Sequence, residues 1–265
     1  MKVQDLTPQL SLVLDEFSAV PHVRSNACIV QYDKSIYLMV YRLFVPERKV
    51  SVDNVPIPWK TRWQNNADTT VLCALKRNTN GDFVVLSEQL VDGTTESAIV
   101  DSRIFYDSEG KLSLSFNTWT QTPTGRMRKE IKNSCVGSWA CTYIAKAHVL
   151  FSGVAPKLSK YQYPCLNIPD VLPQSNRCHK GQREEKNWVW WTSPTKSEMI
   201  SYFVEPHIVF EKSKKSNTCK KVASTTQGSL KKIKDLYPSL NFLLGTPPVK
   251  YSDDEYLAFG HVKYN

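Results

Sequence analysis

The chain has 265 residues, of which 41% are hydrophobic and 22% charged, and this composition excludes a disordered or fibrous protein. Its length suits a single all-β domain that covers residues 1–265. Lysine and arginine number 34 against 25 acidic residues, giving a net charge of +9. This charge favours polyanions, membrane surfaces or phosphate-bearing small molecules as partners, although one solvated lysine-rich loop explains it equally well.

Cysteine and histidine spacing does not indicate a metal centre. The seven cysteines are an odd number without Cys-x-x-Cys pairs, so we expect reduced, packed thiols. His22, His148 and His179 show no ligand spacing, and we expect neither a metal nor a cofactor. The N-terminus lacks the apolar core of a signal peptide, and the longest apolar stretch is too short to cross a bilayer. We therefore expect a cytoplasmic protein without a membrane span.

Short runs rich in Val, Ile, Tyr and Phe predict β-strands throughout the chain. They are Cys28–Gln31, Ile36–Val45, Thr70–Leu75, Phe83–Leu86, Ile104–Tyr106, Leu112–Phe116, Cys141–Ile144 and Tyr202–Phe210. Turn signals such as Asn80-Gly81-Asp82 lie between them, as in antiparallel hairpins. One helix is predicted at Leu230–Leu236, before Pro238. Residues 211–234 are rich in lysine and are expected to form an exposed loop; nucleic acid is not favoured as its partner, because aromatic residues for base stacking are missing.

A repeated unit organises these strands. Each copy has a polar motif, an apolar strand, a turn and an aromatic-rich strand. Four copies run over residues 24–42, 100–117, 185–207 and 245–261, and another centres on residues 138–151. Unequal spacing with insertions suits a radial array of blades. The sequence therefore predicts an all-β, five-bladed β-propeller of antiparallel sheets, with the polar strand ends around one axis.

The motifs at these units resemble those of the five-bladed β-propeller glycosidases, especially the mannoside phosphorylase group and the related propeller-fold glycosyltransferases, with similar sequences in algae and in large DNA viruses such as chloroviruses. The resemblance spans roughly residues 22–263. The matching residues are Asn26 with Tyr41-Arg42, Asp101-Ser102-Arg103, Lys186-Asn187, and Gly245-Thr246-Pro247-Pro248 with His261. Val100 stands where the family has Glu, and this departure favours a transferase over a hydrolase.

The resemblance implies that Asp101 is catalytic, since it lies where the family places its catalytic Asp. Sugar transfer passes through an oxocarbenium-like transition state and needs a group that exchanges a proton with the reacting oxygen. Asp101 would act as the base that deprotonates the acceptor hydroxyl. The alternative is that Asp101 caps a turn and pairs with Arg103.

The other expected site residues bind substrate. Cations suit the phosphate groups of a sugar donor, and the candidates are Arg42, Arg103, Lys186 and His261. A surface ion pair is the alternative for Arg42 and Lys186. Trp188 is expected to stack on a sugar ring, with core packing as the alternative. Glu205 and His207 either orient acceptor hydroxyls or hydrogen-bond a neighbouring blade. The remaining funnel candidates are Asn26, Asp68 and Asn187.

These residues lead to the function that we expect, a metal-independent, inverting glycosyltransferase. Its donor is a sugar nucleotide such as UDP-xylose, or a sugar phosphate, and its acceptor a glycan, in the host cytoplasm if the protein is viral. No Asp-x-Asp metal motif is present. One alternative is a glycoside phosphorylase or hydrolase that acts on mannoside-like oligosaccharides. Another is a non-catalytic carbohydrate-binding propeller, which is favoured if Asp101 is locked in an ion pair.

Overall fold

The structure is a computed structural model, and most of the described residues belong to β-strands. It describes residues 4–12, 22–44, 51–52, 55–56, 68–91, 98–119, 142–153, 156–159, 188–215, 219–253 and 255–264. Within these ranges the helical elements are the 3-10 helix η1 (Thr7–Gln9) and the α-helix α3 (Gly228–Leu236). The predicted all-β class with antiparallel sheets is confirmed.

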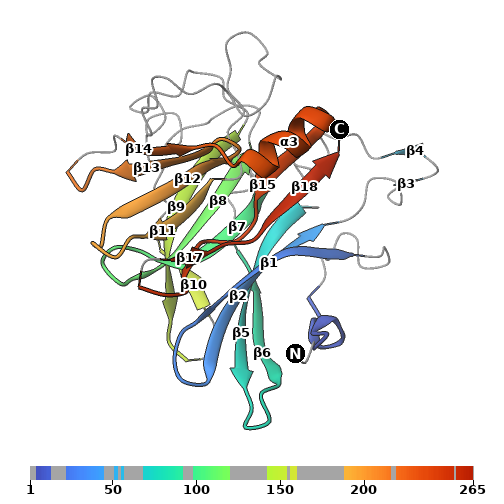
Figure 1. The fold of residues 1–265 in the computed structure, drawn as a ribbon. Helices are drawn as coiled ribbons and strands as arrows, with labels where there is room; N and C mark the ends of the chain where they lie inside the picture. The colour runs from blue at the N-terminus through green and yellow to red at the C-terminus, as the bar shows by residue number, and fades with distance from the viewer. Residues whose placement is uncertain are drawn as a thin grey trace, which may run out of the picture. The chain divides into compact units, whose positions relative to one another are not determined.

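Three four-stranded sheets contain most of the strands (Figure 1). The first has the order β1 (Val23–Gln31), β2 (Ile36–Phe44), β5 (Asp68–Arg77) and β6 (Phe83–Leu90). The second contains β7 (Ala98–Tyr106), β8 (Leu112–Trp119), β9 (Thr142–Phe151) and β10 (Pro156–Leu158). The third contains β11 (Val189–Thr192), β12 (Glu198–Val204), β13 (His207–Lys212) and β14 (Cys219–Thr225).

Three strand pairs complete the described fold. They are β15 (Leu240–Leu244) with β18 (Gly260–Tyr264), β16 (Val249–Lys250) with β17 (Tyr256–Leu257), and β3 (Ser51–Val52) with β4 (Val55–Pro56). In every four-stranded sheet the strands follow their sequence order. A closed ring of five sheets is not seen among the described residues, so the five-bladed arrangement stays a prediction.

One turn geometry recurs in all three four-stranded sheets. In turns 78–82, 107–111 and 193–197, the first residue's N–H bonds the fifth residue's C=O, and the fourth residue's N–H bonds the first residue's C=O. The fourth residue is left-handed each time, at Gly81 (φ +88°), Gly110 (φ +74°) and Lys196 (φ +57°). This is the geometry of a tight hairpin with a bulge residue, which keeps consecutive strands antiparallel.

The chain folds into two compact units. Unit 1 comprises residues 1–104, 116–120 and 147–161, and unit 2 comprises residues 105–115, 121–146 and 162–265. Each unit has its own hydrophobic cluster. That residues 1–265 form one domain stays a prediction.

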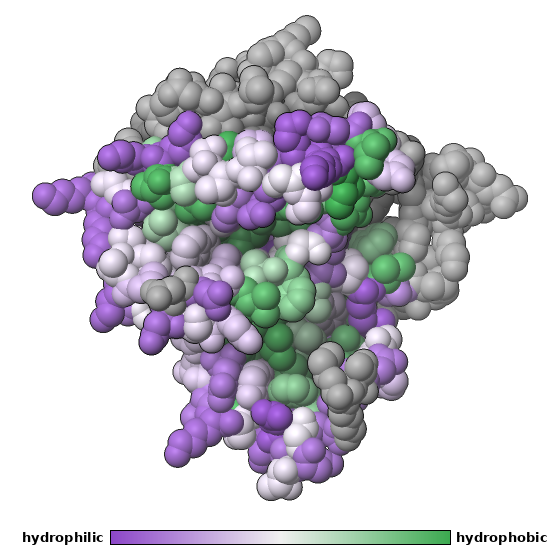
Figure 2. Space-filling model, in the orientation of Figure 1, coloured by the Kyte–Doolittle hydropathy of each residue, from purple (hydrophilic) through white to green (hydrophobic). Residues whose placement is uncertain are grey.

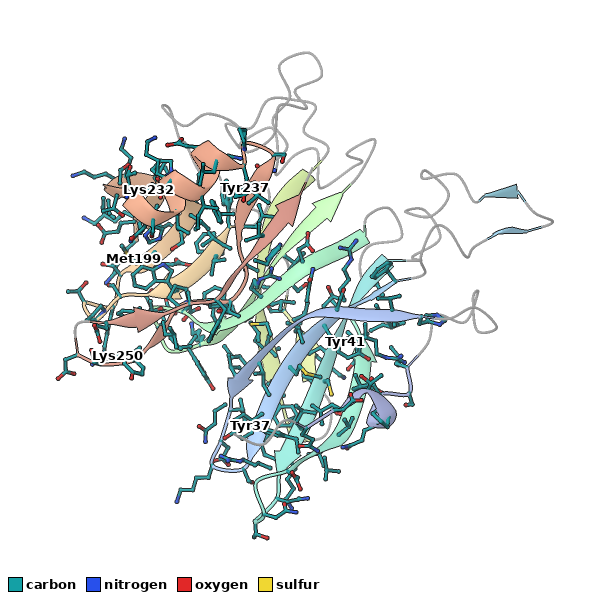
Figure 3. All side chains as sticks on the ribbon, turned by 45° about the vertical axis from the view of Figure 1, so that its right-hand side comes forward. Tyr37, Tyr41, Met199, Lys232, Tyr237 and Lys250 are labelled. Atoms are coloured by element: carbon teal, nitrogen blue, oxygen red, sulfur yellow. The ribbon has the colours of Figure 1, made fainter. Side chains whose placement is uncertain are left out.

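The core of unit 1 lies on one face of its first sheet. Alternate residues of β2 and β5 form it, because side chains two apart on a strand share a face. They are Met39, Tyr41, Leu43, Val71, Cys73 and Leu75, and Leu6, Leu10 and Leu12 of the N-terminal segment pack against them. Figure 3 labels Tyr37 and Tyr41 on this sheet.

The N-terminal segment also covers the edge strand β6. Gln4 donates from Nε2 to the Phe83 C=O (2.8 Å) and accepts from the Phe83 N–H at Oε1 (2.7 Å). Gln9 accepts from the Val85 N–H (3.0 Å). These side-chain amides replace the backbone of a neighbouring strand, so part of the edge is satisfied within the chain.

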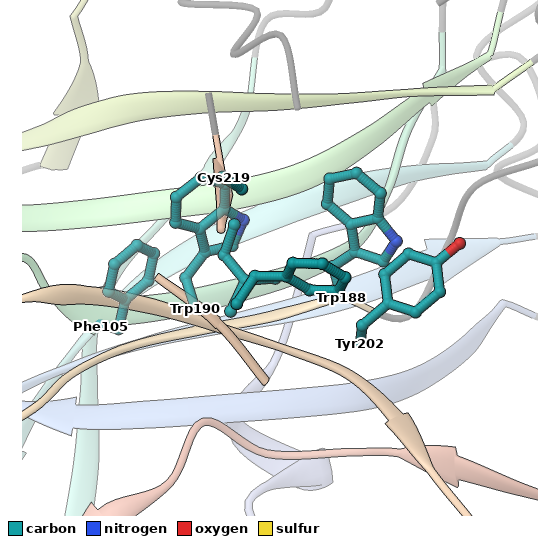
Figure 4. Close-up of a cluster of buried hydrophobic side chains, with 7 residues drawn as sticks. Phe105, Trp188, Trp190, Tyr202 and Cys219 are labelled. Carbon is teal, nitrogen blue, oxygen red and sulfur yellow. The ribbon is translucent and has the colours of Figure 1, made fainter. Parts of the chain in front are cut away.

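The core of unit 2 is aromatic (Figure 4). Trp190 is fully buried and stacks on Phe105 with ring centroids 6.5 Å apart. Tyr202 packs edge-on against Phe210 at 5.7 Å. This cluster accounts for the aromatic density of the third repeated unit.

Two expectations about the third sheet are wrong. The run Tyr202–Phe210 is two strands, because the chain turns at Glu205–Pro206 between β12 and β13. The segment 211–234 is not one loop, since it contains β14 and most of α3. Exposed lysines on an edge strand resemble a loop in composition, and this explains the error.

Candidate functional site

A bulge at the start of β1 positions Asn26, the first residue of the candidate site. Ser25 pairs with Arg42 and Cys28 with Val40, so two residues stand opposite one residue of β2. One of these two, Asn26, adopts a left-handed backbone with φ +54°. The bulge interrupts the regular alternation of the strand and re-aims the Asn26 side chain.

Asp101 on β7 repeats this unusual conformation, with φ +53°. Left-handed residues other than glycine cost of order 1–3 kcal/mol and cluster at functional sites, and Asn and Asp tolerate the conformation best. Asn26 and Asp101 were predicted to occupy corresponding positions of the first two repeated units. The two residues share a left-handed backbone, and their correspondence as blade positions stays a prediction.

The two side chains meet each other and an arginine of β2. Asn26 donates from Nδ2 to Asp101 Oδ1 at 2.9 Å, and Arg42 Nη1 lies 3.5 Å from the same oxygen. The Asp101 side chain is 20% exposed and that of Arg42 is 22% exposed. The Arg42 guanidinium also lies 5.1 Å from the centre of the Phe44 ring, which supports it by a cation–π contact. The candidate site is therefore the Asp101 carboxylate, which contacts the Asn26 amide and the Arg42 guanidinium and is partly exposed to solvent.

A buried polar layer adjoins this site. Thr70 of β5 stands opposite Arg42 in the ladder, and its hydroxyl lies 2.7 Å from that of Ser102, the residue after Asp101. Both hydroxyls are buried, so their hydrogen bond satisfies groups that would be costly to leave unpaired. The sequence analysis did not predict this pair. The one local signal for it was the polar run Asp68-Thr69-Thr70 at the start of a strand.

Two cysteines of unit 1 have thiols with raised pKa values. Burial raises the pKa of the Cys28 thiol, which lies 3.5 Å from the Ile104 C=O. Burial also raises the pKa of Cys73 to about 12. A reactive cysteine needs a thiolate, and these raised pKa values disfavour one near neutral pH.

Arg103 is buried, with 6% of the residue exposed, and its Nη1 donates to the Ser102 C=O at 2.9 Å. Asp101 forms an ion pair with Arg42. Asp68 begins β5 opposite Phe44, and its side chain is not among the described ones. Lys186 and Asn187 lie outside the described residues.

The other predicted residues belong to unit 2. Trp188 is 8% exposed and packs on Tyr202 with centroids 5.4 Å apart (Figure 4), which favours the core-packing alternative. Glu205 accepts the Gln227 N–H at 2.8 Å, just before α3, and this bond secures the helix start. His261 lies on β18 opposite Leu243 and is exposed.

His207 belongs to a small polar and aromatic cluster in unit 2. Its Nε2 lies 3.5 Å from Ser201 Oγ, and Trp191 Nε1 donates to the same hydroxyl at 3.2 Å. The Trp191 ring is 4.9 Å from that of Tyr256. Burial lowers the pKa of His207, so its imidazole is neutral near neutral pH. These contacts join strands of the same sheet, so a hydrogen bond from His207 to a neighbouring blade stays a prediction.

Neither a metal cluster nor a membrane helix occurs in the described part of the chain. There, no three or more His, Cys, Asp or Glu side chains are grouped so that they could bind a metal ion. None of the helices that the structure describes has the length and apolarity needed to span a bilayer.

Comparison with known proteins finds distant structural likeness and no sequence relative. The sequence matches no protein-family profile and no curated protein. Among solved structures, it is similar to a protein of unknown function from Dyadobacter fermentans DSM 18053, with a TM-score of 0.46 and 9% sequence identity. The match covers 91% of this chain and 63% of the other, so this chain spans less than two thirds of that protein's length.

Proposed function

We propose that the protein is a glycosyltransferase that uses a sugar nucleotide, with Asp101 as its catalytic base. The observation that carries the proposal is the left-handed Asp101, held by Asn26 at 2.9 Å and by Arg42 at 3.5 Å. Backbone strain of this kind persists only where the surrounding structure enforces it, and it favours a functional role.

The chemistry follows from the two charged groups. The carboxylate of Asp101 takes the proton from an acceptor hydroxyl as the new glycosidic bond forms at the anomeric carbon. The donor's nucleoside diphosphate leaves with the electron pair of the breaking bond. The Arg42 guanidinium is a permanently charged donor that binds phosphate oxygens in a fixed geometry, and it stabilises the leaving group without a metal.

The sequence repeats support a finer fold for this function. We propose that the three four-stranded sheets are three blades of a five-bladed propeller and that the pair β15–β18 belongs to another. In this arrangement Asn26 and Asp101 stand at the inner ends of two blades, around the funnel in which sugars bind.

A non-catalytic carbohydrate-binding protein is the second candidate, because of the ion pair itself. Arg42 and Asn26 both engage Oδ1 of Asp101, and such a pair can serve to fix the bulge of β1. The pair is partly exposed, and exposed pairs contribute little stability, so we favour the catalytic role.

A thermal-shift screen in the presence of a chelator separates these functions. The ligands are UDP, GDP, inorganic phosphate, mannosides and xylose. A ligand present at 100 times its Kd stabilises the native state by about 2.7 kcal/mol, which corresponds to roughly 5–10 °C for a chain of this size. We expect UDP or GDP to raise the melting temperature more than phosphate does. Arg42→Met should abolish the shift, and Arg77→Met, an exposed arginine of unit 1, should preserve it.

The other outcomes assign the alternatives. Stabilisation by phosphate alone, with mannosides cleaved only in its presence, would establish a phosphorylase. Stabilisation by sugars without turnover of any donor would establish the binding protein. A lack of response to all of these ligands would contradict the proposal.

A further inference from the structure

The positive charge of the chain is concentrated in one short segment. Residues 211–234 contain eight lysines and one glutamate, whereas the other residues contain 26 basic and 24 acidic side chains. The segment forms the end of β13, the edge strand β14 and most of α3, all within unit 2. The rest of the chain is therefore nearly neutral, and this segment is strongly basic.

Most of these lysines have no acidic partner. Lys212 pairs with Glu198 (3.4 Å) and Lys231 with Asp235 (2.6 Å), and Lys234 donates to the Pro238 C=O (2.9 Å). The five remaining lysines are exposed and have no ion pair with any described residue. They are Lys214, Lys215, Lys220, Lys221 and Lys232. We call these five residues the lysine surface.

Helix α3 adds apolar groups beside this charge. None of its residues is buried. Leu236 is 73% exposed, Tyr237 is 55% exposed, and Ile233 is also exposed. Lys232 and Leu236 are four residues apart and share a face of the helix. Figure 2 shows strongly hydrophilic and hydrophobic surface side by side over α3, and Figure 3 labels Lys232 and Tyr237 there.

We propose that α3 and the lysine surface bind peripherally to the surface of an anionic lipid membrane. A short helix with lysines and exposed Leu and Tyr side chains has the character of an interfacial helix, whose apolar residues enter the lipid boundary while its lysines meet the headgroups. The partner is the lipid surface itself.

Two features favour lipid over nucleic acid as the partner. Residues 211–234 contain no Arg for bidentate contacts to phosphate or guanine, and among the surface residues named above Tyr237 alone could stack on an unpaired base. Exposed Leu236 and Ile233 add nothing to phosphate binding, but their burial in a lipid interface is favourable by the hydrophobic effect.

Vesicle flotation of the full chain tests this inference. The vesicles are phosphatidylcholine alone and phosphatidylcholine mixed with phosphatidylserine, at low and high salt. We expect binding only to the mixed vesicles, and weaker binding at high salt. Each lysine near an anionic surface contributes about fivefold in affinity, so Lys220→Glu, Lys221→Glu and Lys232→Glu together should reduce binding at least about a hundredfold.

Two further variants make the result specific. The triple variant Lys34→Glu, Lys76→Glu and Lys157→Glu changes the net charge equally but lies outside the lysine surface, and it should bind as the wild type does. Leu236→Ser should weaken vesicle binding, with exposed Leu150→Ser of unit 1 as its control. Circular dichroism establishes that each variant is folded.

Several results would overturn the inference. They are a lack of binding to the mixed vesicles, an equal loss in the control triple variant, and an unchanged affinity in Leu236→Ser. Binding to a double-stranded DNA fragment without binding to vesicles would assign the lysine surface to nucleic acid. Equal competition by soluble phosphate at matched ionic strength would assign it to free phosphate.

Discussion

At the scale of single residues, Asp101 combines a strained backbone with two polar partners. The sequence pointed to the three residues but not to the contacts between them. Asn26, Arg42 and Asp101 were expected at the site because the motifs that contain them resemble those of the propeller glycosidase family. Their mutual contacts through Asp101 Oδ1 depend on β-bulge geometry, which leaves little trace in one sequence. Trp188 was harder to place, since an aromatic residue beside a polar motif suits a sugar site and a core equally well.

His207 yields a prediction about pH. Burial lowers its pKa below the ordinary value of about 6.5, so the unfolded chain takes up a proton first as the pH falls. Above about pH 6.5 the imidazole is neutral in both the folded and the unfolded chain, so the full free energy of unfolding is present. Below that pH the unfolded chain binds the proton more readily, and the free energy of unfolding decreases. Chemical denaturation at about pH 7.5 and about pH 5.5 should show a smaller acid-induced loss of stability for His207→Gln than for the wild type.

His261→Gln is the matched control for this measurement, because it removes an exposed imidazole of the same unit. The loss of stability in His261→Gln shows how much of any change follows from removing an imidazole of unit 2 and not from the burial of His207. Equal losses in the wild type and in His207→Gln would show that the His207 environment does not oppose protonation.

At the scale of elements, strands and hairpins follow from the sequence more readily than their ends do. The runs 36–45, 83–86 and 112–116 predicted β2, β6 and β8, since their alternation and their turn residues are local properties. The helix at Leu230–Leu236 is also confirmed, with two more residues at its start. The strand β14 was missed because lysines on an exposed edge hide the apolar pattern of a strand.

The hairpin between β11 and β12 provides a prediction at this scale. Lys196 is left-handed at the position where the related turns have Gly81 and Gly110. A side chain in this conformation costs about 1 kcal/mol, so Lys196→Gly should raise the free energy of unfolding by about that amount. Urea denaturation measures the change. Thr195→Gly, one residue earlier, should lower stability, and a loss in both variants would contradict the shared turn geometry.

At the scale of the whole molecule, the sequence predicted the all-β class with antiparallel sheets, and the structure confirms it. Three sheets have four strands each, in sequence order. The closure of a propeller depends on contacts between distant parts of the chain, which short motifs do not encode. The aromatic core of unit 2 and the cover of β6 by Gln4 and Gln9 are likewise products of tertiary contact.

The five-bladed arrangement is itself a prediction. An experimental structure should place Asn26, Asp101, Asn187 and Pro248 at corresponding positions of successive blades, near one axis. A parallel sheet, or a scatter of these four residues over unrelated faces, would contradict the propeller and the funnel proposed with it.

The central claim is that Asp101 is the catalytic group, and the release of nucleoside diphosphate tests it most directly. Wild type, Asp101→Asn and Asp107→Asn are compared in a chelator with UDP- and GDP-sugars, including UDP-xylose. Asp107 accepts the Glu109 N–H at 3.0 Å and the Lys111 N–H at 2.9 Å in a turn, so its variant controls for a structural aspartate. We expect Asp101→Asn to slow release by about a hundredfold to ten-thousandfold while it stays folded, and Asp107→Asn to release nucleotide at the wild-type rate below its melting temperature. An unchanged rate in Asp101→Asn, or an equal loss in folded Asp107→Asn, would contradict the claim.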